Sequence, residues 1–124
     1  MERYLTRNAL ERSLEQGRTV EQWLGVRTEN DHRILKWLSI ERDRAGHTIL
    51  RISEVLDEGG PGLYDVYEFT PYDSNAEFGV ELSFDSPEQA LDHAIRNLGA
   101  DPQKFVDDGV VQLEYKDYLS KRPA

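Results

Sequence analysis

The sequence predicts an α+β fold: an antiparallel β-meander of about four to five strands, with N-terminal helices, one well-capped helix packed on the sheet, and a final strand. Three observations support this class. Several β-like runs follow one another through short turns between residues 34 and 85, a strongly capped amphipathic helix follows them, and a short helical pattern precedes them. Consecutive strands joined by short turns form antiparallel meanders with helices gathered on one face or end.

The N-terminal segment is typical of helix. Thr6 suits an N-cap, Leu10 and Leu14 recur at i and i+4, and Gly17 suits the left-handed residue that ends a helix. Residues 19–22 then have the spacing of a capping box, which predicts a second short helical turn that carries Trp23. The expected helical segment spans about residues 6–25.

A change of period at residue 34 indicates the first strand. In residues 34–42 the apolar side chains fall on both faces, with Leu38 on one and Trp37 on the other, so this strand is expected to be central. Residues 43–46 have turn chemistry, with Gly46 suited to a positive φ. Residues 48–55 should therefore pair back as an antiparallel strand.

Two further strands are predicted after the glycine-rich turn at residues 56–62. The first covers residues 63–70 and stops at Pro71, which has no amide donor. The second covers residues 78–85 and alternates strictly, which is the pattern of a half-buried strand. Its apolar face comprises Phe78, Val80, Leu82 and Phe84.

The best-signalled helix begins at Ser86, followed by a proline at the first helical position and a glutamate in the first turn. Gly99 suits its C-terminal end. A short helical turn that carries Phe105 and Val106 is expected to begin at Asp101 and to end at Gly109. The alternation of Val111, Leu113 and Tyr115 then predicts a final strand.

Length and composition predict one α+β domain over residues 1–124, with the sheet and its helix in about 32–119. A chain of 124 residues normally forms a single domain, and its two Trp, six Tyr and four Phe can fill a core. The absence of cysteine excludes disulfides and thiol nucleophiles. No signal peptide or membrane-spanning run is recognisable, so a cytoplasmic protein is expected.

Charge is distributed unevenly along the chain, which has a formal net charge of −9. Residues 1–51 hold ten basic and eight acidic side chains, whereas residues 52–124 hold five basic and sixteen acidic ones. Between residues 52 and 95 there are eleven acids and no Lys or Arg. That segment would repel phosphate, so we expect neither nucleic acid nor a membrane as a partner.

Sequence motifs assign no catalytic residue, no metal and no cofactor, and an enzyme is the less favoured class. The histidines His32, His47 and His93 lack metal-ligand spacing, although the first two flank the predicted hairpin and could approach each other. A series of possible oxygen ligands begins at Asp73 with the spacing of a calcium loop. Phe78 occupies the position of the glycine that such a loop requires, and Phe84 occupies that of its final glutamate, so a calcium loop of this type is excluded.

The leading hypothesis is a non-enzymatic interaction or inhibitor-type protein whose acidic half, residues 52–95, binds a basic partner protein. Opposite charge steers such an encounter, and aromatic faces accept Lys and Arg side chains. The candidate partner-binding residues are Asp65, Tyr67, Glu68, Phe69, Tyr72, Asp73, Glu77 and Glu81.

Two alternatives stay open. One is a small-molecule-binding or catalytic domain with an aromatic pocket between the sheet and the helices, lined by Trp23, Trp37, Tyr67 and Phe69. The other is a homo-oligomer that pairs through the face of Trp37 or through residues 110–115. Sequence does not distinguish a buried apolar face from an intersubunit one.

Overall fold

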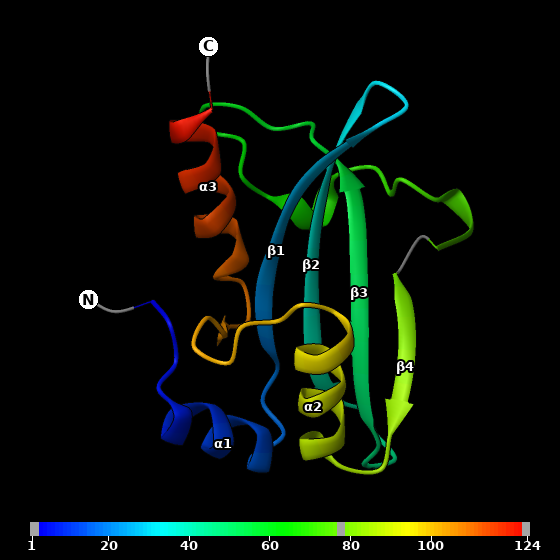
Figure 1. The fold of residues 1–124 in the computed structure, drawn as a ribbon, viewed down its shortest axis with the longest axis vertical. Coiled ribbons are helices and arrows are strands. Elements are labelled where there is room, and N and C mark those ends of the chain that lie inside the picture. The colour runs from blue at the N-terminus through cyan, green and yellow to red at the C-terminus, as the bar shows by residue number, and fades with distance from the viewer. Residues whose placement is uncertain (1–2, 77–78, 123–124) are drawn as a thin grey trace.

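An antiparallel sheet of five strands forms the centre of the computed structural model, which describes residues 3–76 and 79–122 (Figure 1). The strand order is β4-β3-β2-β1-β5, so three successive strands form a meander and the last two occupy its edges. The predicted α+β class with an antiparallel sheet is therefore confirmed. The strands are β1 (Val20–Glu29), β2 (His32–Arg42), β3 (Thr48–Leu56), β4 (Val80–Phe84) and β5 (Val106–Asp107).

Strand β2 is central, as its two-faced pattern predicted. It pairs with β1 on one side and with β3 on the other, and Leu38 lies between Gln22 and Ile52 in the register. Leu38 and Trp37 point to opposite faces, and both are buried. A strand flanked on both sides and covered on both faces has to be apolar on both faces.

Helices α1 (Arg7–Glu15) and α2 (Pro87–Asn97) cover one face of the sheet (Figure 1). Both predicted N-caps are confirmed, because the Thr6 hydroxyl accepts from the Ala9 amide at 3.1 Å and the Ser86 hydroxyl from the Gln89 amide at 3.3 Å. The buried core on this face comprises Leu10, Leu14, Val20, Leu38, Ile40, Leu50, Ala90, Ala94, Ala100 and Phe105.

The opposite face is covered in part by helix α3 (Val111–Lys121) and by the 3₁₀ turn η1 (Val66–Glu68), which Figure 1 shows behind the sheet. A second 3₁₀ turn, η2 (Ser74–Ala76), lies in the connection to β4. The buried cluster on this face comprises Leu35, Trp37, Val55, Val66, Val106, Val111 and Tyr115. The sheet therefore separates two cores.

The expected helical turn at residues 19–25 is wrong, because these residues belong to β1. The capping-box signal is local, whereas pairing with β2 satisfies the backbone groups along the whole segment. The register shifts between Trp23 and Gly25, and Gly25 has a φ of 110°. Such a bulge interrupts the alternation that would have identified the strand from the sequence.

The predicted strand at residues 63–70 is also wrong. The Asp65 carboxylate accepts from the Tyr67 amide at 3.2 Å and caps the turn η1, so the chain bends where an extended strand was expected. Val66 fills the core from this turn with none of its surface exposed. Pairing with β3 is limited to an isolated bridge between Val55 and Pro71.

The predicted final strand at residues 111–115 is a helix, α3. Val111 and Tyr115 are both fully buried and lie at i and i+4 on one helical face, whereas Leu113 is 46% exposed. Apolar residues at positions 111, 113 and 115 are compatible with the alternation of a strand. Residues 111 and 115 also have the four-residue spacing of one helical face, and the structure adopts the helix. The strand that follows α2 is β5, which is two residues long and begins five residues before the predicted strand. It contains Val106, so the helical turn predicted for Phe105 and Val106 is wrong.

Strand β4 confirms the last part of the predicted meander from Val80 onward, while Phe78 lies outside the described residues. Leu82 and Phe84 are half-buried on the α2 face, and Val80 is 52% exposed. In the part of the chain that the structure describes, no helix has the length and apolar character needed to cross a membrane.

Candidate functional site

A concave region of about 780 Å³ lies on the face of the sheet opposite α1 and α2. We call it the hollow. Residues of β1, β2, β3 and β4 that point to this face form its floor, because alternate residues of a strand share a face. One row of the floor crosses these four strands, in the order Glu21, Ser39, Arg51 and Glu81. The other side of the hollow is formed by residues 67–71.

Arg51 lies at the centre of the floor and holds two carboxylates. Its two terminal nitrogens contact Glu41 at 2.5 Å and Glu81 at 2.7 Å, while its Nε is buried without a hydrogen-bond partner among the described residues. Arg51 is the one basic side chain among the described residues that line the hollow. The acidic lining residues are Glu21, Glu41, Glu54, Glu68, Glu81 and Asp108.

Glu21 is the most buried of these acids, with 3% of its surface exposed. Its carboxylate accepts hydrogen bonds from the Tyr67 hydroxyl at 2.7 Å and from the Gly109 amide at 2.9 Å. Burial raises the pKa of Glu21 above its ordinary value, and the two hydrogen bonds oppose that rise. The pKa of Tyr67 is also raised, first by burial and then by its bond to Glu21.

Aromatic rings line the same region. Tyr67 meets Trp37 edge to face, with ring centroids 5.7 Å apart, and Phe69 also lines the hollow. Trp37 contacts the ring of Tyr67 and Glu21 holds its hydroxyl, while Tyr67 as a whole is 42% exposed. Fixed rings beside carboxylates suit a cationic group, which is attracted both to the negative charges and to the ring faces.

The structure brings four of the predicted partner-binding residues to the hollow: Tyr67, Glu68, Phe69 and Glu81. Three others lie elsewhere. Asp65 caps η1, Asp73 accepts from the Asn75 amide at 2.9 Å, and the Tyr72 hydroxyl accepts from the Asn30 side chain at 3.2 Å. The eighth, Glu77, lies outside the described residues.

Of the four residues suggested for an aromatic pocket, Trp37, Tyr67 and Phe69 line the hollow and Trp23 does not. Trp23 packs under α3, with its ring 6.2 Å from that of Tyr115 and 6.3 Å from that of Tyr118. The hollow is bounded by the sheet and residues 67–71, whereas α1 and α2 lie on the other face.

The acidic half of the sequence is not one acidic surface. Arginines from elsewhere in the chain pair with several of its carboxylates, as Arg96 does with Asp92 and Arg122 with Asp57, each at 2.8 Å. The side chain of Asp57 is 2% exposed and also accepts from the Tyr115 hydroxyl. These pairs leave the hollow as the place where acidic residues gather around a single arginine.

Sequence reasoning missed Glu21, Glu41, Arg51 and Asp108. The capping-box pattern at residues 19–22 predicts a helical turn for Glu21, so the sequence gives no indication of its strand pairing with Ser39. Alternation in residues 34–42 puts Trp37 and Glu41 on the same face of the strand. Because Trp37 was a candidate pocket residue, this pattern could have identified Glu41 as its neighbour at the site. Nothing near Asp108 in the sequence relates it to Tyr67.

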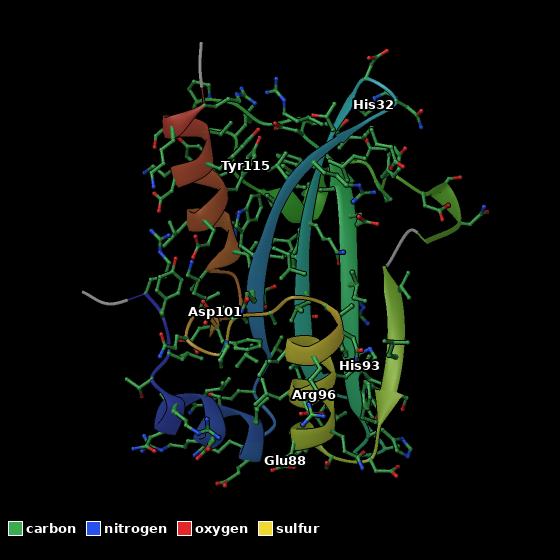
Figure 2. All side chains as sticks on the ribbon, in the orientation of Figure 1. His32, Glu88, His93, Arg96, Asp101 and Tyr115 are labelled. Carbon is green, nitrogen blue, oxygen red and sulfur yellow. The ribbon has the colours of Figure 1, made fainter. Side chains whose placement is uncertain are left out.

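The histidines do not gather. His32 lies at the far end of the β1–β2 hairpin and His93 on α2 (Figure 2), while His47 lies beyond the opposite end of β2 from His32. The expected approach of His32 to His47 is wrong, because the whole length of β2 separates them. Within residues 3–76 and 79–122, no three His, Asp or Glu side chains are grouped so as to hold a metal ion.

A second concave region, a groove of about 1190 Å³, lies on the other face between α1 and α2. Leu10, Leu14, Leu91 and Ile95 line it together with charged side chains of both helices. Glu88 and Arg96 in Figure 2 mark α2 on this side of the sheet.

No protein-family model, no curated protein and no solved structure matches this chain.

Proposed function

We propose that this protein is an interaction protein that binds a basic partner protein through the hollow. The observation that carries the proposal is the composition of the lining, which holds six acidic side chains, three aromatic rings and one arginine. Arg51 pairs with Glu41 and Glu81, and Arg27 pairs with Glu54, so acidic side chains outnumber basic ones at the hollow. Electrostatic complementarity of this kind raises association rates and selects partners of opposite charge. The proposal narrows the acidic surface expected from residues 52–95 to this one region.

Exposure of the rim supports binding of side chains from outside. Tyr67, Glu68, Glu81 and Asp108 are all exposed, so a Lys or Arg side chain can reach them without opening the fold. The guanidinium of Arg51 contacts the carboxylates of Glu41 and Glu81, and a partner's Lys or Arg side chain would make contacts of the same kind. Bonds of this charge-assisted type are stronger than neutral ones.

Affinity capture with matched variants tests this function. The hollow variant combines Glu68→Gln, Glu81→Gln and Asp108→Asn. The control variant combines Glu11→Gln, Glu88→Gln and Asp92→Asn on α1 and α2, which removes the same number of charges from the opposite face. Each protein is immobilised and exposed to lysate at low salt and at about 0.5 M salt, where charges are screened beyond a few ångströms.

We expect the wild type and the control variant to retain one basic protein at low salt and release it at high salt. The hollow variant should retain at least tenfold less of the same protein. Equal retention by the two variants, or retention that does not depend on salt, would contradict the proposal.

The volume of the hollow favours a second candidate, a small cationic ligand, because ligand pockets commonly enclose about 300–1,000 Å³. Native mass spectrometry of the protein purified from its source cells distinguishes the two candidates. A bound small molecule that is lost on Tyr67→Ala, with no protein captured, would replace the first proposal by the second.

A further inference from the structure

Strand β4 is an unpaired edge of the sheet. It pairs with β3 alone, and Figure 1 draws no element on its outer side. Among the described residues, no backbone group of residues 80–84 bonds to anything but β3. An edge of this kind presents a row of free N–H and C=O groups on which another extended chain can pair.

The two edges of the sheet differ in how they are protected. Edge strands are commonly blunted by being very short or by carrying charged side chains, proline or a bulge. Strand β5, at the other edge, is two residues long. Strand β4 is five residues long, contains no Pro, and keeps an unbroken register with β3 from Val80 to Phe84, with Glu81 as its one charged side chain.

The two faces of β4 have different chemistry. Val80, Leu82 and Phe84 point to the α2 side, and Val80 remains 52% exposed there. Glu81 and Ser83 point to the opposite side, where Glu81 lines the hollow. A strand added beside β4 would meet an apolar neighbour on one face and a carboxylate on the other.

We propose that an extended segment of the basic partner adds to β4 as a sixth strand, with apolar side chains alternating with Lys or Arg. Its basic side chains lie over Glu81 at the rim of the hollow, and its apolar ones lie beside Val80 and Leu82. The proposal rests on the proposed function, because the hollow supplies the charge that selects the segment. Addition of a strand to a sheet edge is a general mode of peptide recognition.

A second copy of this chain fits the edge less well than a basic segment does. Each chain has a net charge of −9, and a second β4 would bring another Glu81 to the same edge. Like charges that meet across paired strands are destabilising. The charge of the hollow therefore distinguishes between the two occupants of the edge.

Two synthetic peptides of equal composition test the proposal. One alternates, Lys-Val-Lys-Val-Lys-Val-Lys, and the other is reordered, Lys-Lys-Val-Val-Val-Lys-Lys; both have blocked ends. Hydrogen exchange followed by NMR reports the protection of the amides of residues 80–84. We expect saturating alternating peptide to slow exchange at the outward amides of β4 by tenfold or more, and the reordered peptide to bind at least tenfold more weakly.

Matched variants of the protein complete the test. Val80→Lys should weaken binding of the alternating peptide by tenfold or more, since it removes an apolar contact and adds repulsion at the edge. Leu113→Lys, which makes the same change on the distant α3, should alter it less than twofold. Both side chains are about half exposed, 52% and 46%, so both variants should fold.

Failure of the edge proposal is distinguishable from failure of the proposed function. Absence of binding, equal binding of the two peptides, or unprotected amides at residues 80–84 would overturn the edge proposal. The proposed function is tested separately, by affinity capture of the basic protein with the hollow variant and its control. The peptide results do not change the outcome of that experiment.

Discussion

The two faces of the sheet are built by the same strands and have different roles. On the α1 and α2 face, Leu38, Ile40 and Leu50 are at most 1% exposed and form a closed apolar core. On the opposite face of the same strands, Glu41 and Arg51 lie in an open hollow. Alternation within a strand allows one backbone to supply both surfaces, because successive side chains point to opposite faces.

Helix α3 explains why only part of the second face is open. It packs next to β1, where Trp23 and Tyr115 form an apolar cluster with Tyr118. The hollow lies where most side chains of this face are polar, and the apolar Trp37 is covered there by Tyr67. Polar side chains there do not require cover, so the face is free to bind.

The largest effect on stability is expected in the buried core between the sheet and helices α1 and α2. Phe105 is fully buried in the α1 and α2 core, and Phe105→Ala should lower the free energy of unfolding by about 3–5 kcal/mol. Urea denaturation at neutral pH measures the change. A loss below about 1 kcal/mol would show that this core is less closely packed than the structure indicates.

A smaller effect is expected at the buried carboxylate that joins α3 to the end of β3. Asp57→Asn weakens the contacts with the Tyr115 hydroxyl and with Arg122, and should lower the free energy of unfolding by about 2 kcal/mol. The free energy of unfolding of Tyr115→Phe, which removes the hydroxyl contact with Asp57 and keeps the contact with Arg122, is measured for comparison. If Asp57→Asn left stability unchanged, Asp57 would not secure α3.

The buried acid of the hollow should make stability depend on pH. Because the folded protein raises the pKa of Glu21, its protonated form is favoured on folding, and this stabilisation is lost as pH rises through the folded-state pKa. Relative to wild type, Glu21→Gln should therefore gain stability as pH increases from 4 to 7. Parallel stability curves for the two proteins, from urea titrations at each pH, would show that Glu21 has an ordinary pKa when folded.

The smallest effect on stability is expected from the exposed charges of the hollow. Glu68→Gln and Asp108→Asn should each change the free energy of unfolding by less than about 0.5 kcal/mol, since both side chains are exposed. Their effect belongs to binding alone. Thermal unfolding of each variant is the measurement, and a change above 1 kcal/mol would indicate that the charges also hold the fold together.

Sequence reasoning predicted the hairpin of β2 and β3, most of β4, and the helices α1 and α2. In the structure, four of the eight residues proposed to bind a partner line the hollow. Sequence reasoning failed where two periods fit the same residues, as at 111–115, and where a local capping pattern competed with strand pairing, as at residues 19–25. It missed Arg51 because Arg51 meets Glu81 only through the pairing of β3 with β4, over 30 positions of the chain.

By itself, the sequence determined the α+β class, the helix caps at Thr6 and Ser86, and the alternation of the central strands. The caps and the alternation depend on residues that lie within about four positions of one another, so they are visible in the sequence. Only the tertiary structure decided the hollow. The bond of Tyr67 to Glu21 spans 46 positions, and that of the Gly109 amide to Glu21 spans 88. Contacts between such remote residues follow from the strand order, which no local pattern encodes.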